Sequence, residues 1–195
     1  ESKTPHRNLF DAKISGRTVG VLRVATMVSP EHKWIRSQND LKLSPEAGFW
    51  LSYMEDGVGQ LEQNGKSVLQ NSGDIVLYDA ARPFEYNLLP NTGVSSVVHI
   101  MRMPRDLLLF RTRQATSIIA TPFDSNVGLK TIIIDMIKEL QINPLMHDNS
   151  LAASHFSDSM LDIIASAIEL CLGREVDKKK VDAIYDRACL YIKCN

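Results

Sequence analysis

The spacing of apolar residues changes once along the chain, close to Pro122, and this change divides the sequence into two parts. Before it, apolar and polar residues alternate in short runs rich in β-branched side chains, as in RTVGVLRVATMV at residues 17–28. Such alternation is typical of strands with one buried face. After it, apolar residues recur every three or four positions, as they do in amphipathic helices. We therefore expect a β-rich part over residues 1–123 and a helical part over residues 124–173.

Turn signals divide the first part into short strands. Asn64-Gly65 is the dipeptide preferred in a type I′ hairpin turn, and Arg82-Pro83 fits a turn in which proline fixes φ. At Gly73-Asp74 we expect the carboxylate to accept hydrogen bonds from amides of its own turn. Short strands separated by turns roughly every ten residues are typical of a sandwich or a jelly-roll barrel.

The second helix of the helical part is expected over residues 150–172, followed by Gly173 as the residue that ends it. Its apolar stripe is too wide for a single packing partner. Either a second subunit covers one side of it, or the barrel and the preceding helix cover both sides within one chain. The first alternative predicts a dimer contact made by Leu151, Met160, Leu161, Ile164, Ile168 and Leu172.

Composition excludes several classes of protein. The net charge of −1 provides no overall basic field with which this segment could hold a nucleic acid by itself. The three cysteines lie in the last quarter of the chain without a C-x-x-C pair, which favours a reducing cytoplasm over a disulfide scaffold. No apolar run approaches the ~20 residues that span a bilayer, so we expect no membrane contact. The chain opens on Glu1 and stops inside a helical pattern, so we expect a piece of a longer protein.

The sequence lacks the patterns of common catalytic sites. A protein metal site needs at least three ligands that converge at about 2 Å. Of the five histidines, only His99 falls on an expected strand, and there is no His-x-His pair. Glycine-rich phosphate loops and G-x-S-x-G elbows are also missing. We therefore expect no metal, no cofactor, no catalytic residues and no enzymatic activity.

One segment is specific enough to indicate a family. Residues 63–86 contain QNGK, SGDIVLYDAA and RPFEY in that order. This run resembles the N-terminal effector domain of AraC/XylS transcription regulators, in the branch with the pattern Q-x-G, P-G-D-x-x-L-x-D and R-P-[YF]. Ser72 stands where that family usually has proline. MRMPRDLL at residues 101–108 and the segment before Arg36 also look like parts of the family's barrel.

The resemblance implies a mainly β fold with added helices: a cupin-like jelly-roll β-barrel followed by an antiparallel α-helical hairpin that dimerises. Residues 177–195 look like the linker and the truncated start of a helix-turn-helix DNA-binding domain. The implied partners are a small-molecule effector, a second copy of the chain, promoter DNA through the missing domain, and RNA polymerase in the full-length protein.

A barrel of about eight strands can hold one small ligand, in a pocket of aromatic walls and a few polar groups. On the strand at residues 94–101 we choose the face with Val97, His99 and Met101 as the inner one, because it has the titratable and polarisable groups. Arg36, Tyr86 and His99 match, by resemblance, positions where the family's arabinose-binding member contacts its sugar. Core packing is the alternative role for every residue of the predicted ligand set, which comprises Arg36, Trp50, Tyr78, Phe84, Tyr86, Val97, His99 and Met101.

The aromatic content of this set favours an aromatic or medium-sized apolar effector over a sugar. Two other functions stay open at this point. A cupin-type metal-dependent isomerase or dioxygenase would contain a metal that elemental analysis detects. A constitutive dimerisation scaffold with a filled barrel would show no ligand-dependent change in melting temperature.

Overall fold

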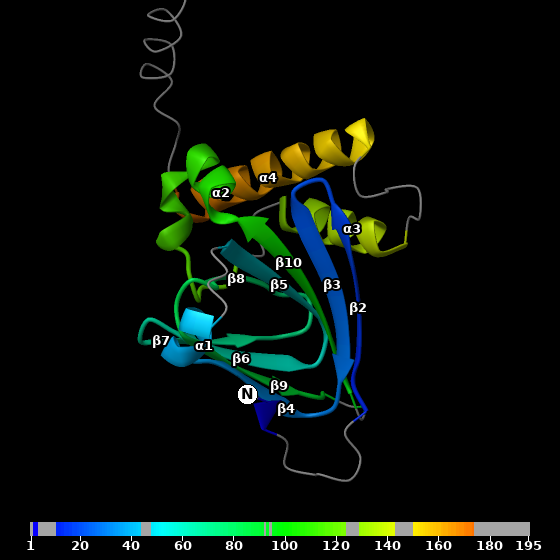
Figure 1. The fold of residues 1–195 in the computed structure, drawn as a ribbon, viewed down its shortest axis with the longest axis vertical. Coiled ribbons are helices and arrows are strands. Elements are labelled where there is room, and N and C mark those ends of the chain that lie inside the picture. The colour runs from blue at the N-terminus through cyan, green and yellow to red at the C-terminus, as the bar shows by residue number, and fades with distance from the viewer. Residues whose placement is uncertain are drawn as a thin grey trace, which may run out of the picture.

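The computed structural model describes residues 2–3, 11–43, 48–91, 93, 95–123, 129–142 and 150–173, and Figure 1 shows their arrangement. The described strands form two five-stranded antiparallel sheets. The β9 sheet contains, in spatial order, β1 (Ser2–Lys3), β4 (His32–Arg36), β9 (Phe84–Leu89), β6 (Val58–Gln63) and β7 (Lys66–Gln70). The β10 sheet contains β2 (Lys13–Val19), β3 (Leu22–Ser29), β10 (Ser96–Pro104), β5 (Gly48–Asp56) and β8 (Ile75–Asp79).

The chain crosses repeatedly from one sheet to the other, since β4, β6, β7 and β9 belong to one sheet and β5, β8 and β10 to the other. This confirms the predicted jelly-roll arrangement. Among the described strands the two sheets form separate hydrogen-bond ladders, so the barrel is a sandwich of two facing sheets. Side chains on the two inner faces meet between the sheets.

Two turn predictions are confirmed. Asn64 and Gly65 link β6 to β7 with φ values of 54° and 74°, the left-handed pair that a type I′ turn requires. The Asp74 carboxylate accepts a hydrogen bond from the Asn71 amide at 2.9 Å. Its other oxygen lies 3.1 Å from the Lys130 ammonium, so this turn is also joined to the helical part.

The helices lie along the outer face of the β10 sheet, where α3 (Leu129–Ile142) contacts β2 and β3, and α4 (Leu151–Cys171) contacts β2. Figure 1 shows α3 and α4 running in opposite directions, as the predicted hairpin requires. The shorter helices are α1 (Gln38–Leu43), α2 (Arg105–Arg111) and the 3₁₀ turn η1 (Arg113–Thr116). Both α2 and η1 contact α4.

Local chemistry sets both ends of α4 and its distance from the sheet. The Ser150 side chain accepts a hydrogen bond from the Ala153 amide at 3.0 Å and caps the first turn. Gly173, with φ of 63°, follows the last turn as predicted. At Gly20, in the β2–β3 turn, an added Cβ would lie 2.3 Å from the Ser157 hydroxyl. Glycine at this turn is therefore what allows α4 to pack so closely on the sheet.

The burial of α4 decides between the two alternatives for its wide apolar stripe. Met160, Leu161, Ile164 and Ile168 are fully buried within the single chain. The predicted contact of these four side chains with a second subunit is therefore wrong, because α2, α3, η1 and β2 surround the helix and use them as core. Of the other two predicted dimer residues, Leu151 is 74% exposed and Leu172 is half-buried.

Two sequence predictions need separate mention. Residues 177–195, expected to be a linker and the start of a DNA-binding domain, lie outside the described residues. Within the described part of the chain, no helix combines the length and apolar character needed to cross a membrane.

The burial of α4 gives a direct stability test. Replacing Ile164 with alanine leaves a cavity in the core, and we expect it to lower the free energy of unfolding by about 2–5 kcal/mol. Leu170 lies on the same helix but is 55% exposed. We expect Leu170→Ala to change that free energy by only about 0.5 kcal/mol. Urea unfolding followed by circular dichroism measures both, and equal losses would contradict the assigned burial.

Candidate ligand-binding site

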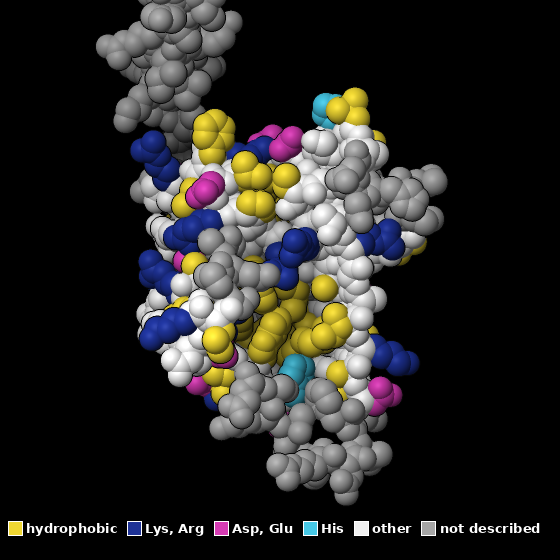
Figure 2. All heavy atoms as spheres, viewed as in Figure 1, with side chains coloured by type: hydrophobic (Ala, Val, Ile, Leu, Met, Phe, Trp, Pro, Cys, Tyr) yellow, Lys and Arg dark blue, Asp and Glu magenta, His cyan; other side chains and the backbone are white. Residues whose placement is uncertain are grey.

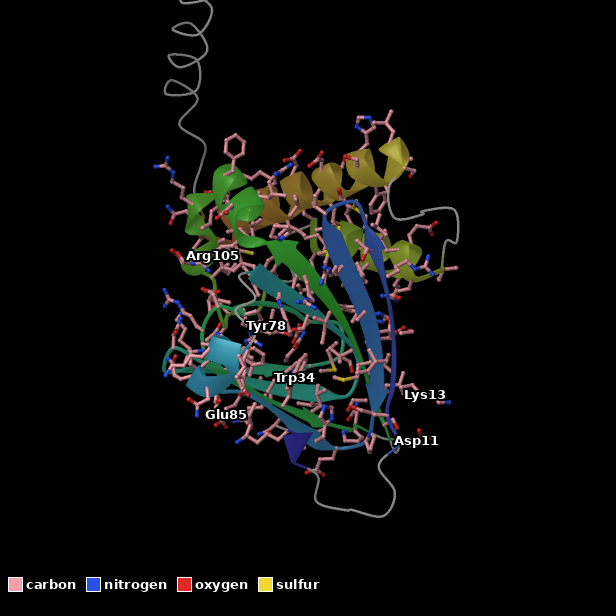
Figure 3. The ribbon with its side chains drawn as sticks, viewed as in Figure 1. Asp11, Lys13, Trp34, Tyr78, Glu85 and Arg105 are labelled. Carbon is pink, nitrogen blue, oxygen red and sulfur yellow. The ribbon has the colours of Figure 1, made fainter. Side chains whose placement is uncertain are left out.

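A cluster of aromatic rings occupies the space between the two sheets. Trp50 points inward from the β10 sheet, and Trp34 and Phe84 point inward from the β9 sheet. The Trp34 ring centroid lies 5.4 Å from that of Trp50 and 5.9 Å from that of Phe84. Tyr78, on β8, lies 5.8 Å from Trp50 and 5.0 Å from Phe84. Figure 3 labels Trp34 and Tyr78 in this space. The ring contacts join the two sheets, and we call these four rings the aromatic wall.

The structure thus brings together four of the predicted ligand residues: Trp50, Tyr78, Phe84 and Tyr86. The sequence analysis missed Trp34, because residues around it were not assigned to a strand. In HKWIR at residues 32–36, Trp34 and Arg36 alternate with Lys33 and Ile35, and this two-residue period could have revealed β4.

The two tyrosines of the cluster differ in their hydrogen bonds. The Tyr86 hydroxyl donates to Gln70 Oε1 at 2.5 Å, and the Gln70 amide group donates to the Ser52 carbonyl at 2.9 Å. The Tyr78 hydroxyl is fully buried and has no hydrogen-bond partner among the described residues. Burial raises the pKa of both phenols, so both remain protonated and able to donate. A buried hydroxyl without a partner costs free energy, which a ligand with an acceptor would recover.

Arginines stand at the edge of this aromatic space. The Arg102 guanidinium lies 4.9 Å from the centre of the Trp50 ring, in cation–π geometry. Arg23 is the register partner of Arg102 on the neighbouring strand, so both face the same side of the sheet. Together they line a hollow of about 360 Å³ whose walls are Val21, Arg23, Gly48, Trp50, Arg102, Met103 and Pro104. Figure 2 shows a hydrophobic recess between the sheets with Lys or Arg atoms along its upper rim.

Arg36, another residue of the predicted ligand set, lies on β4 of the facing sheet. Its Nε donates to the Ala80 carbonyl at 2.9 Å, which fixes the guanidinium beside the turn that precedes β9. Desolvation, and next the like charges of Arg23 and Arg36, lower the pKa of Arg102. The guanidinium groups of Arg23 and Arg36 are therefore close enough to act electrostatically on that of Arg102.

The prediction that Val97, His99 and Met101 face the interior is wrong. In the β5–β10 ladder Arg102 pairs with Trp50 and His99 pairs with Tyr53. Alternate residues of a strand face opposite sides, so the inward side chains of β10 belong to Ser96, Val98, Ile100 and Arg102. Val97, His99 and Met101 are on the outer face of the sheet, toward the helices.

His99 has a complete set of contacts on that outer face. Its Nδ1 lies 2.9 Å from the Thr26 hydroxyl and its Nε2 lies 2.7 Å from the Glu55 carboxylate. The imidazole stacks on the Tyr53 ring at 5.4 Å, and Lys138 of α3 approaches the same carboxylate at 4.0 Å. The histidine therefore belongs to the contact between sheet and helix. In the part of the chain that the structure describes, no group of three or more His, Cys, Asp or Glu side chains could hold a metal ion.

The residues that gave the family resemblance build the frame of the site. The Gln63 amide group exchanges two hydrogen bonds of 2.8 Å with the backbone of Asp79, which ties β6 to the end of β8. The buried Asp79 carboxylate lies 2.6 Å from Arg105 of α2 and 3.4 Å from Arg82. These residues hold strands, turn and helix together without entering the aromatic space.

The contrast between the two phenols is testable without a ligand. We expect Tyr78→Phe to raise the free energy of unfolding by about 1 kcal/mol, because it removes a buried hydroxyl with no partner. We expect Tyr86→Phe to lower it by about 1 kcal/mol, because it breaks the bond to Gln70. Chemical denaturation of the two matched variants measures both changes. A loss of stability in Tyr78→Phe as large as in Tyr86→Phe would mean that the Tyr78 hydroxyl has a partner.

Two relatives are similar to this chain in sequence, and the chain covers a different share of each. The transcriptional activator NphR of a Rhodococcus species is 25% identical over 165 residues, which are 83% of this chain and 48% of that protein. A Bacillus protein described only as uncharacterized, from a nit 5′ region, is 20% identical over 185 residues, which are 95% of this chain and 69% of that protein. The chain therefore spans about half the length of NphR.

The fold agrees with that of a solved regulator. The crystal structure of the AraC-like transcriptional activator CuxR matches with a TM-score of 0.73 at 16% identity, over 86% of this chain and 60% of that one. Residues 2–169 match the family described as AraC-binding-like domain, which is most of the sequence. The chain therefore belongs to the AraC-binding-like domain family of transcription regulators.

Proposed function

We propose that this chain senses a small organic effector and controls promoter binding by a helix-turn-helix domain that lies outside it. The effector binds between the two sheets, against the rings of Trp34, Trp50 and Phe84. The observation that supports this best is the aromatic wall beside a buried Tyr78 hydroxyl that has no partner. Binding pockets typically combine such apolar walls with a few polar groups that fix orientation. The predicted aromatic or medium-sized apolar effector suits this lining.

A regulatory role is supported by the relatives, since both NphR and CuxR are named as transcriptional activators. We therefore favour a sensor without catalytic activity over a cupin-type metal enzyme. A regulator of this kind acts on promoter DNA and RNA polymerase. We therefore propose a cytoplasmic location for the full-length protein.

Strand β10 offers a physical route from effector to helices. Its inward residue Arg102 touches the aromatic wall, while its outward neighbours Met101 and Met103 pack beneath the helical layer. Arg111 of α2 then binds Asp158 and Asp162 of α4 at 2.9 and 2.7 Å. An effector that prefers one position of β10 would shift the population of helix arrangements. The coupling requires different effector affinities in the two arrangements.

The experiment that tests the sensing function is a thermal-shift screen of the chain against small aromatic and medium-sized apolar compounds. We expect at least one compound to raise the melting temperature, because a ligand that binds only the folded state stabilises it. Trp34→Ala should abolish the shift, since it removes part of the aromatic wall. Phe110→Ala is the matched control, because Phe110 is 88% exposed on α2. A screen without any shift would refute the sensing function.

We also propose that the chain forms a homodimer through the exposed surface of its helical part. The core positions of α4 cannot serve, so the predicted residue that remains accessible there is Leu151. We expect Leu151→Glu to lower the mass measured by sedimentation toward that of one chain, because it places a charge in an apolar contact. Leu43→Glu is the control, because Leu43 is 85% exposed on α1, in the other layer of the molecule. An unchanged mass in folded Leu151→Glu would refute this contact.

A further inference from the structure

We propose that a groove at the C-terminal end of α4 binds the segment that follows this helix, residues 174–180, with Val176 as the side chain that enters it. These residues lie outside the described part of the chain. They lead into the residues that resemble the start of a DNA-binding domain. The inference concerns a contact of the chain with itself, so it does not depend on whether an effector binds between the sheets.

The groove has a volume of about 540 Å³ and combines apolar and charged walls. Ile118 and Phe123 are buried at its base, and Leu172, the residue after α4, forms part of its side. The ion pair of Asp74 and Lys130, with charged atoms 3.1 Å apart, also lines it. A groove of this kind suits a short segment in which an apolar side chain has charged neighbours.

The chain leaves α4 beside this groove. Cys171, the last residue of α4, and Leu172 both line it, and Gly173 follows with φ of 63°. A glycine in this left-handed conformation ends the helix and turns the chain away from the helix axis. Val176 is four residues beyond Leu172, and four residues span at most about 14 Å. Its side chain can therefore reach the groove.

The sequence of the segment matches the walls of the groove. Residues 174–180 read REVDKKK, so Val176 is the single apolar side chain in a charged stretch. Its removal from water onto the apolar base stabilises the contact. Arg174 and Glu175 precede it with charges of opposite sign, and the ion pair of the groove offers a counterpart to each. Exposed ion pairs contribute little, so Val176 supplies most of the affinity and the charges orient the segment.

The base of the groove is hydrogen-bonded to the strand that contains Tyr78. The Ala120 amide donates to the Leu77 carbonyl of β8 at 3.0 Å. The Phe123 amide donates to the Ile75 carbonyl of the same strand, also at 3.0 Å. Under the proposed sensing function, a displacement of β8 by an effector would therefore change the groove, and with it the population of the bound segment.

The test is limited digestion of the chain with trypsin, followed by mass spectrometry. Trypsin cleaves after Arg174, and a bond held in the groove is cleaved only while the segment is released. Thr121 is exposed and lines the groove, so the ring in Thr121→Trp would occupy it. We expect cleavage after Arg174 to become at least about tenfold faster in this variant, because the burial of a valine is worth about that factor.

Val176→Ser tests the other side of the contact, and we expect it to accelerate the same cleavage. Because this substitution lies close to the cleaved bond, each rate is divided by that of a synthetic peptide of residues 170–180 with the same sequence. The matched control for the groove is Ser67→Trp, since Ser67 is also exposed but lies on β7 of the other sheet. We expect the control to leave the cleavage rate unchanged.

Circular dichroism verifies that the variants are folded, and Val176→Ser decides the question should Thr121→Trp not fold. Equal corrected rates in the unaltered chain and in the folded variants would overturn the proposal. Protection of the Arg174 bond that disappears on dilution of the unaltered chain would assign the groove to a second copy and would also overturn it. None of these results bears on the sensing function, which the thermal-shift screen measures independently.

Discussion

The buried carboxylate of Asp79 is the contact on which the arrangement of the site depends. Asp79 is the last residue of strand β8. Its backbone is hydrogen-bonded to the Gln63 side chain of β6, and its carboxylate binds Arg105 at the start of α2. The turn that follows it presents the Ala80 carbonyl to Arg36 at 2.9 Å and leads directly into Phe84. The Asp79–Arg105 ion pair and the turn beside it therefore fix Phe84 of the aromatic wall, Arg36 and the start of helix α2. A buried charge must be paired, so loss of Arg105 would disturb all of these elements together.

Strands β5, β8 and β10 are buried on both faces of their sheet, and this explains how the sheet can serve two purposes. Its inner face contributes Trp50 and Arg102 to the space between the sheets, whereas its outer face supplies Met101 and His99 to the contact with the helices. In a sheet with one solvated face, the displacement of a strand on that face would move only water and would not be transmitted to another element. Here any displacement of β10 must be accommodated by the helices, because well-packed interiors transmit strain.

The same double burial explains where prediction from the sequence succeeded and failed. The change of periodicity near Pro122, the turn at Asn64-Gly65 and the helix end at Gly173 are local signals, and the structure confirms them. The inward face of β10 could not be predicted, because both faces of the strand are buried and alternation of polarity no longer distinguishes them. His99 was misassigned for this reason: its polarity serves a contact with Glu55 beneath the helices. The burial of Ile164 and Ile168 likewise depends on which elements surround α4, and helical spacing does not contain that information.

Under the proposed sensing function, the buried Tyr78 hydroxyl lowers the stability of the ligand-free chain. A sandwich optimised only for stability would pair the Tyr78 hydroxyl. This unpaired hydroxyl is unfavourable in the isolated chain, and it becomes favourable when a ligand with an acceptor is present. The free energy that the ligand recovers is then available to change the balance between alternative positions of β10 and the helices. A core with every polar group paired would have no such reserve, and for this reason the buried Tyr78 hydroxyl supports the proposed sensing function more directly than the fold itself does.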